Sequence, residues 1–234
     1  MSSLDFESRL IRRGLCKINN NFPDHLIFYR GKIENKDVVY LASGIGKTNA
    51  SRGTTILIEK FLPELIINFG VAGAYPLSGL RIGGIAVAEK ETYGDEGLFL
   101  QDGFHTLEIM GIPLLKRTRK EYFNEFSLGK KLVERAVKSS SYQKKDIRSG
   151  NFVTVSTCSG TKKRAIELKR RFDAICENME GAAVAHICAI YGIPMLEIRG
   201  ISNIVQDRDI KKWDLKLASE NCQRVVINFL KSCS

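Results

Sequence analysis

Short apolar runs alternate along the chain with longer stretches in which apolar residues recur every three to four positions. The apolar runs of strand length are residues 38–43, 65–70, 85–93, 151–156, 173–176 and 193–202. We predict a β-strand in each, because runs of this length rich in β-branched residues favour strands. The run LIINFG at 65–70 is apolar without alternation, which is typical of a strand whose two faces are both covered.

The intervening stretches have a helical pattern. We predict helices over residues 48–61, 127–139, 161–171, 179–192 and 213–231. Gly192, with Pro194 just beyond it, ends the fourth helix. In the fifth helix, one apolar stripe is formed by Leu215, Ala218, Cys222, Val225 and Phe229. This alternation predicts a single α/β domain over residues 1–234, built as a three-layer α/β/α sandwich around a mixed, largely parallel twisted sheet.

In such sheets, ligands bind beyond the carboxyl ends of the strands. The segments at these ends are residues 43–48, 69–75, 156–161, 176–181 and 199–203, and all are rich in glycine and small polar residues. We therefore expect the functional site there.

Composition narrows the class of function. The 234 residues carry a formal net charge of +10, which raises the possibility of a nucleic-acid partner. The basic residues are scattered over helical stretches such as 161–171, without interleaved aromatic residues, so solvated helix faces explain them better. The sequence has no apolar stretch of the ~18–20 residues that cross a membrane. We expect a cytoplasmic protein without a nucleic-acid or membrane partner.

Cysteine and histidine patterns give no sign of a metal site. None of the six cysteines shows CxxC spacing, and the three histidines show no metal-ligand spacing. The cysteines are typical of a reducing compartment. We expect neither a metal nor a cofactor.

Two glycine-rich segments remain ambiguous. SGIGKT (43–48) lacks the first glycine of a phosphate-binding loop, because Leu41 stands there, and Asn49 replaces the third glycine of a dinucleotide fingerprint. The strand end at Val71, Ala72 and Gly73 is bare enough for a flat ring or a sugar to lie against the main chain. Tight turns and tight helix–sheet packing explain both segments equally well.

Two polar residues suggest nucleoside chemistry. Glu180 falls at the start of a predicted helix, where the helix dipole favours its ionised form, and a carboxylate can accept two hydrogen bonds from a vicinal diol. The amide of Asn203 offers a donor and an acceptor, which match the edge of a 6-oxopurine. An ordinary first-turn glutamate and an Asx-turn residue are the simpler alternatives.

Taken together, the blocks SGIGKTNAS, LIINFGVAGAYP, ENMEGAAVAHIC and EIRGISN resemble the nucleoside phosphorylase/nucleosidase superfamily, in order and spacing, over about residues 4–230. This superfamily contains purine nucleoside phosphorylases and methylthioadenosine/S-adenosylhomocysteine nucleosidases. Within it, GVAGAYP, ENMEGAAVAH and RGISN are most similar to futalosine hydrolases, which release hypoxanthine from futalosine in an alternative menaquinone pathway. The resemblance implies a purine nucleoside phosphorylase-like fold and an N-glycosyl hydrolase.

The resemblance also implies roles for individual residues. Glu180 holds the ribose 2′- and 3′-hydroxyls, and Met179 packs under the sugar. Val71, Ala72, Gly73 and Ser202 line the substrate. Asn203 contacts the N7 side of the purine, where adenine-releasing relatives carry an acid, so Asn203 favours hypoxanthine as the leaving base.

Glu7 matches the family glutamate that activates the attacking water. The family has an apolar first strand before this glutamate. We expect that strand to be missing here, because only six residues precede Glu7 in the sequence. Arg208, or else Lys47, is the candidate partner for the 5′ carboxylate of futalosine. For Asp207, Arg208 and Asp209, a self-paired loop is the simpler alternative.

Water rather than phosphate is the expected nucleophile, because residues 68–71 supply neither a cation nor a hydroxyl. The alternatives are a methylthioadenosine/S-adenosylhomocysteine nucleosidase and a nucleoside-binding relative without catalysis. The resemblance further implies a homo-oligomer, a dimer or larger, that binds a small-molecule nucleoside.

Overall fold

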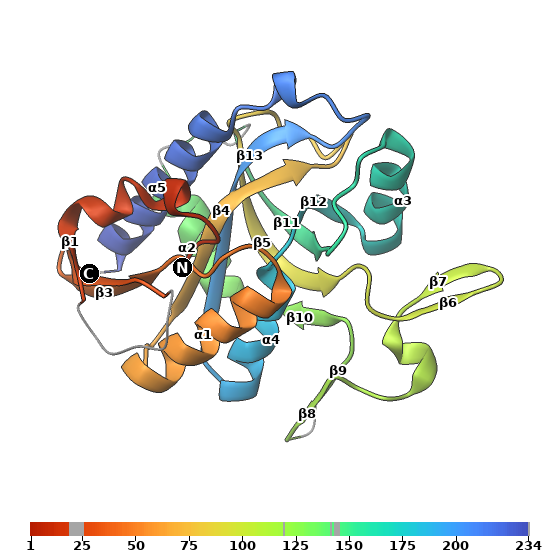
Figure 1. Cartoon of the computed structure of the whole chain (residues 1–234), viewed down its shortest axis with the longest axis horizontal. Helices are drawn as coiled ribbons and strands as arrows, with labels where there is room; N and C mark the ends of the chain where they lie inside the picture. Colours follow the sequence, from red (N-terminus) through yellow and green to blue (C-terminus); the bar gives the residue numbers. More distant parts are fainter. Residues whose placement is uncertain (19–25, 119, 141, 143–145, 234) are drawn as a thin grey trace.

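The computed structural model describes the chain except for residues 19–25, 119, 141, 143–145 and 234. Its centre is a six-stranded sheet (Figure 1). In spatial order the strands are β10 (Glu125–Ser127), β5 (Ile85–Tyr93), β11 (Ile147–Thr154), β12 (Ala174–Asn178), β4 (Ile66–Ala74) and β13 (Met195–Ile204). Strand β13 also pairs with β5, so the sheet closes on itself.

This sheet is mixed, as expected, and its longest ladders are the parallel ones. The parallel pairs are β5–β11, β11–β12 and β4–β13, and the antiparallel pairs are β5–β10, β4–β12 and β5–β13. Register shifts between Gly150 and Asn151 and between Ile201 and Asn203 interrupt two of the parallel ladders. Such irregularities increase strand bending and twist, which suits a sheet that closes. Periodicity along single strands does not reveal these pairings.

The helices lie on two sides of the sheet and bury separate apolar clusters. On one side, α1 (Lys47–Phe61) packs against α4 (Gly181–Tyr191), and their cluster includes Leu57 and Val184. On the other, α5 (Leu215–Ser232) covers β4 and β13, and α2 (Lys130–Ser139) packs beside it on β5 and β11, with Phe229 in their cluster. Helix α3 (Lys162–Phe172) packs on β11 and β12. None of the helices in the described part of the chain is long and apolar enough to cross a membrane.

Strand β4 extends further than the apolar run predicted. It continues through Val71, Ala72 and Gly73 to Ala74, because β13 pairs with this half on one side and β12 pairs with it at Gly73 and Ala74 on the other. The bare segment that we placed beyond a strand end is therefore strand itself.

The N-terminal region joins the main sheet to a smaller one. Strands β1 (Leu15–Lys17), β2 (Phe28–Ile33) and β3 (Lys36–Leu41) form an antiparallel sheet. Ser2 forms a parallel bridge with Ala42 at the end of β3, and the Phe69 amide of β4 donates to the Met1 carbonyl at 3.0 Å. Residues 1–3 thus lie between β3 and β4. The 3-10 helices η1 (Asp5–Ser8) and η2 (Ile11–Gly14) follow.

The remaining elements were not expected from the sequence, because they are very short. Two hairpins project from the body (Figure 1). They are β6 (Leu98–Leu100) with β7 (Gly103–His105) and β8 (Leu115–Arg117) with β9 (Lys120–Tyr122), and η3 (Leu107–Met110) lies between them. The helix η4 (Ile210–Lys212) precedes α5.

Candidate active site

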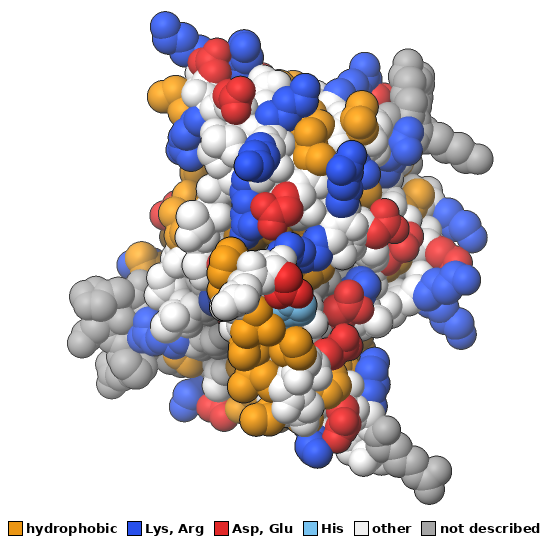
Figure 2. Space-filling model, turned by 90° about the vertical axis from the view of Figure 1, so that its right-hand side faces the viewer, with side chains coloured by type: hydrophobic (Ala, Val, Ile, Leu, Met, Phe, Trp, Pro, Cys, Tyr) orange, Lys and Arg blue, Asp and Glu red, His pale blue; other side chains and the backbone are white. Residues whose placement is uncertain are grey.

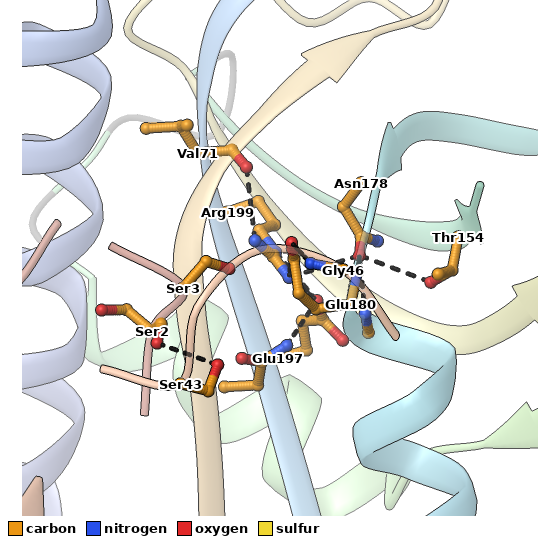
Figure 3. Close-up of polar contacts among 12 residues, drawn as sticks. Ser2, Ser3, Ser43, Gly46, Val71, Thr154, Asn178, Glu180, Glu197 and Arg199 are labelled. Atoms are coloured by element: carbon orange, nitrogen blue, oxygen red, sulfur yellow. Dashed lines mark hydrogen bonds and ion pairs between the residues drawn. The ribbon is translucent and has the colours of Figure 1, made fainter. Parts of the chain in front are cut away.

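A buried arginine in β13 stands at the centre of the site (Figure 3). Arg199 is 1% exposed, and its Nε and Nη2 each lie 2.8 Å from Oε1 of Glu197. Its Nη1 donates to the Val71 carbonyl at 3.3 Å, and its Nη2 donates to Oδ1 of Asn178 at 3.3 Å. Sequence reasoning missed Arg199 and Glu197, although two charged residues inside an otherwise apolar strand were a signal for them.

Glu180 is buried and faces Arg199. It immediately precedes α4, so its backbone position matches the expected helix start. Its Oε2 lies 3.5 Å from Nη2 of Arg199, and its Oε1 accepts the Gly46 amide at 3.0 Å. Oδ1 of Asn178 accepts the amides of Glu180 and Gly181 at 2.9 and 2.7 Å, which fixes the chain where α4 begins. Met179 is half-buried beside Glu180.

The turn at residues 43–48 has a structural role in this arrangement. Gly46 adopts a φ of 91°, which favours glycine, and this conformation aims its N–H at the Glu180 carboxylate. The segment thus contributes a backbone donor to the site, and it is neither a phosphate loop nor a dinucleotide fingerprint.

Glu7 lies in the same cluster. It is 2% exposed, its Oε2 accepts the amides of Ser3 and Leu4 at 3.0 and 2.9 Å, and its Oε1 accepts the Val71 amide at 2.8 Å. Burial raises the pKa of this carboxyl, while Arg199 and the backbone donors act in the opposite direction. A buried carboxyl held by three backbone N–H groups is well placed to take a proton.

Gly70 leaves the space that Glu7 fills. A Cβ at this position would lie 2.4 Å from Oε1 of Glu7 and 3.0 Å from Nη1 of Arg199, so a side chain at Gly70 and the present carboxylate position exclude each other. The close approach of Glu7 and Arg199 to the main chain of β4 therefore explains why residue 70 is a glycine.

Ser202 and Asn203 form a second group at the end of β13. The Ser202 hydroxyl lies 2.8 Å from Oδ1 of Asn203 and 3.2 Å from the Ala72 carbonyl. The contact with the hydroxyl assigns Oδ1 of the Asn203 amide, which leaves Nδ2 as a donor without a hydrogen bond to any residue in the described part of the chain. The side chain lies beside Gly73, where a Cβ would be 3.3 Å from Nδ2.

A cavity of about 160 Å³ opens beside Asn203. Ser159, Arg208 and Trp213 also line it. The Arg208 guanidinium lies 5.0 Å from the Trp213 ring centre, a cation–π contact, and the Arg208 amide donates to the Gly160 carbonyl at 3.2 Å. The structure therefore brings Arg208 together with Asn203.

The acidic neighbours of Arg208 are engaged elsewhere. Asp207 accepts the Lys162 amide at 3.2 Å, and Asp209 accepts the Lys211 amide at the same distance. Asp209 also lies 3.4 Å from Nζ of Lys212, so the loop is self-paired through Asp209, whereas Asp207 bonds to the start of α3.

Glu177 holds the loop at 156–161 against the cavity through Ser159, and sequence reasoning gave neither residue a role. Glu177 is 6% exposed, its Oε1 accepts the Ser159 amide at 2.8 Å, and its Oε2 accepts the Ser159 hydroxyl at 2.6 Å. Burial raises the pKa of Glu177. The carboxylate thus anchors Ser159 at the wall of the cavity.

Lys47 is already paired. Its Nζ lies 2.5 Å from Oδ1 of Asp95 and 3.0 Å from Oε1 of Glu96, and it stacks on the Tyr93 ring. Two carboxylates neutralise this cation, so it is a poor candidate for binding a substrate carboxylate. Within the described residues, no group of three or more His, Cys, Asp or Glu side chains is arranged to hold a metal ion.

Comparisons with known proteins identify the class of enzyme that this chain is similar to. The chain is 31% identical over 209 residues to a 5′-methylthioadenosine/S-adenosylhomocysteine nucleosidase of Staphylococcus haemolyticus, covering 89% of this chain and 86% of that one. It is 33% identical over 208 residues to a futalosine hydrolase of Thermus thermophilus, covering 89% and 87%. These relatives are N-glycosyl hydrolases, which confirms the predicted enzyme class.

Solved structures confirm the nucleoside phosphorylase-like α/β fold. The 5′-methylthioadenosine/S-adenosylhomocysteine nucleosidase of Colwellia psychrerythraea, solved in complex with adenine, superposes with a TM-score of 0.81 at 25% identity, covering 99% of this chain and 93% of that one. The model of the phosphorylase superfamily matches residues 8–231. The predicted superfamily is thus confirmed, and the chain belongs to the phosphorylase superfamily.

Proposed function

We propose that the protein hydrolyses the N-glycosidic bond of a purine nucleoside. The observation that carries the proposal is the buried cluster of Glu7, Glu180 and Arg199, in which two carboxylates from distant parts of the chain meet around one guanidinium. In this proposal Glu180 binds the ribose hydroxyls, and Glu7 accepts a proton from the attacking water.

The mechanism follows from charge. As the C1′–N9 bond breaks, positive charge develops on the ribose and negative charge on the base. Glu180, fixed by Gly46 and Arg199, holds the sugar through its 2′- and 3′-hydroxyls. A carboxylate offers about four acceptor directions, so the bonds that Glu7 receives from the backbone leave room for a water. Water adds to C1′ as the C1′–N9 bond breaks and Glu7 takes one of its protons. The departing base takes a proton from solvent, and Glu7 later returns its proton to solvent.

Water is favoured over phosphate by the carboxylates of the site. Residues 68–71 offered no cation in the sequence, and the structure brings Arg199 to them from β13. This guanidinium is already paired with Glu197 and faces Glu180, while Glu7 occupies the space beside Gly70. A phosphate dianion placed there would meet carboxylates on several sides, whereas a neutral water would not.

The identity of the leaving base separates two candidates. Most of the relatives that the comparisons name are 5′-methylthioadenosine/S-adenosylhomocysteine nucleosidases, which favours an adenine nucleoside. Asn203 favours a 6-oxopurine, because its Nδ2 can donate to O6 and N7, whereas adenine presents an amino donor at position 6. We propose futalosine as the substrate on the strength of Asn203, and the adenine nucleoside is the second candidate. In this proposal Arg208 meets the carboxylate of futalosine.

One assay tests the proposal. The protein is incubated with futalosine, inosine or methylthioadenosine, with and without phosphate, and the free base is measured by chromatography. We expect hypoxanthine from futalosine, independent of phosphate. Adenine from methylthioadenosine as the faster product would establish the second candidate. Base release that requires phosphate would refute hydrolysis, and no release from any of the three would refute the enzyme.

We also propose a homo-oligomer. Exposed apolar side chains gather on the projecting segment 98–112, including Phe99, which is 84% exposed, and Ile109, which is 53% exposed. Figure 2 shows hydrophobic side chains grouped on the face turned toward the viewer, with basic and acidic side chains intermingled elsewhere on it. Apolar groups of this kind are typical of protein interfaces. Light scattering of the purified protein measures the mass, and a monomer would contradict the proposal.

A further inference from the structure

Two more carboxyl groups lie beneath the site, in the interior of the sheet. Glu91 of β5 and Glu197 of β13 are both 0% exposed. They approach each other beside Gly181, the first residue of α4. A Cβ on Gly181 would lie 2.0 Å from Oε1 of Glu91 and 2.5 Å from Oε2 of Glu197, so both oxygens flank the same small gap.

The hydrogen bonds of this pair leave one oxygen unaccounted for. Glu91 accepts the Thr154 hydroxyl at 2.7 Å on Oε2 and the Asn178 amide at 2.6 Å on Oε1. On Glu197, Oε1 accepts from Arg199 and from Nδ2 of Asn68 at 3.1 Å. Among the described residues, Oε2 of Glu197 has no hydrogen-bond partner, and it faces Glu91. A proton between these two oxygens would satisfy both of them.

The charged groups around Glu91 and Glu197 also favour one proton on this pair. Arg199 is the cation that both carboxyl groups face. The other titratable groups that face this cluster come from several parts of the chain: the Met1 amine, Glu7 on η1, Tyr93 on β5, Cys176 on β12, Glu180 before α4, Cys188 on α4 and Cys222 on α5. Four buried carboxyl groups around one guanidinium cannot all be ionised. Burial, and for Glu91 the neighbouring Glu197, raises the pKa of both carboxyls, while Arg199 opposes the rise.

We propose that Glu91 and Glu197 share one proton, and that the pair positions Arg199 and Asn178 for Glu180. With one proton the pair carries a single negative charge, which balances the Arg199 guanidinium. Asn178 links the pair to the catalytic face, because its Nδ2 donates to Glu91 while its Oδ1 accepts the Glu180 amide. Glu91 and Glu197 are thus positioning residues that act through Arg199 and Asn178.

A kinetic consequence follows, and it rests on the proposed hydrolysis. In this proposal the pair holds its shared proton at neutral pH and loses it as the pH rises. Loss of the shared proton would place a second negative charge beneath Arg199 and draw the guanidinium away from Glu180, which it now meets at 3.5 Å. We therefore expect kcat to fall at alkaline pH, with a smaller change in KM.

The test begins with a readout that needs no substrate. Infrared spectra of the wild-type protein and of Glu91→Gln, Glu197→Gln and the control Glu64→Gln are recorded across a pH series. Glu64 is exposed, so its substitution leaves the interior unchanged. We expect the C=O band of a neutral, buried carboxylic acid in the wild type near neutral pH, lost as the pH rises, absent from Glu197→Gln and unchanged in Glu64→Gln. Absence of this band from the wild type would overturn the shared proton, even if a variant fails to fold.

The second readout is the pH profile of nucleoside hydrolysis. In Glu197→Gln the neutral amide cannot ionise, so its alkaline limb should move to higher pH than in the wild type, while Glu64→Gln keeps the wild-type profile. A Glu197→Gln profile that coincides with the wild type would overturn the positioning role. An infrared band without hydrolysis of any nucleoside would instead refute the proposed function and leave the proton pair standing.

Discussion

Gly70→Ala is the substitution that tests the site with the smallest chemical change. It adds one methyl group to β4, where the new carbon would lie 2.4 Å from Oε1 of Glu7 and 3.0 Å from Nη1 of Arg199. Real Cβ contacts below 3.0 Å are essentially absent from proteins, so the Glu7 carboxylate must move. The strand conformation itself accepts alanine, because Gly70 does not have a positive φ.

The expected magnitudes follow from the contacts that move. Alanine restricts the unfolded chain and would by itself stabilise the protein by about 0.4–1 kcal/mol. Against this, overpacking costs about 1–3 kcal/mol, and loss of the charge-assisted bond from the Val71 amide to Glu7 costs about 1.5–3 kcal/mol. We expect a net loss of about 2–5 kcal/mol in unfolding free energy. A catalytic group misplaced by about 1 Å can lower the rate about 100-fold, so kcat should fall by this order.

The assay compares kcat/KM and urea unfolding for Gly70→Ala, Glu7→Gln and Gly129→Ala. Gly129 is exposed, and a Cβ there meets only Leu132, at 3.5 Å or more, so this variant controls for the glycine-to-alanine change itself. Gly70→Ala and Glu7→Gln should lose activity together, and Gly129→Ala should retain it. A folded Gly70→Ala with wild-type kcat/KM would refute the assignment of Glu7 as the group that activates water.

Other substitutions probe the remaining parts of the site. Asn203→Asp should raise the ratio of adenine to hypoxanthine released, measured by chromatography, because a carboxylate accepts from the adenine amino group and a protonated acid can donate to N7; an unchanged ratio would mean that Asn203 does not select the base. Glu177→Ala should raise the KM for the nucleoside and lower the unfolding free energy by about 1–3 kcal/mol, because the Ser159 amide and hydroxyl lose their acceptor. A KM equal to that of the wild type would mean that the Ser159 loop does not contribute to nucleoside binding. Arg199→Met should lower the unfolding free energy in urea by about 3–5 kcal/mol, since Glu197 stays buried without its cation. Burial raises the pKa of Glu7 in the folded protein, so the stabilisation linked to its proton is complete below the ordinary glutamate pKa and is lost as the pH rises through the folded value. The melting temperature of the wild type should therefore fall over this pH range, and that of Glu7→Gln should not show this fall. Parallel plots of melting temperature against pH for the two proteins would contradict the prediction.

The sequence predicted most of the strands and helices because their hydrophobic periods are local. Residues 85–93, for example, coincide with β5, and residues 48–61 with all but the first residue of α1. The closure of the sheet was not predictable in this way, because the β5–β13 pairing joins residues more than a hundred positions apart. The short hairpins were missed because three-residue strands carry too little pattern.

The site was predicted in part for a similar reason. Glu180 and Asn203 belong to blocks with a family pattern, and the structure places them at the start of α4 and the end of β13. Arg199 and Glu197 lie in the interior of one strand, where both are buried. Their neighbours Glu7, Glu91 and Glu180 come from distant parts of the chain, so only the folded structure shows the cluster. The sequence signal for these two residues was the presence of two charges in an otherwise apolar predicted strand.

The central claim is that water cleaves a purine nucleoside here and that Asn203 selects a 6-oxopurine as the leaving base. A competition assay tests this most directly, with futalosine and methylthioadenosine at equal concentration in one phosphate-free mixture. The ratio of hypoxanthine to adenine released gives the ratio of the two kcat/KM values. We predict that hypoxanthine is released faster, whereas faster release of adenine would contradict the assignment of the base.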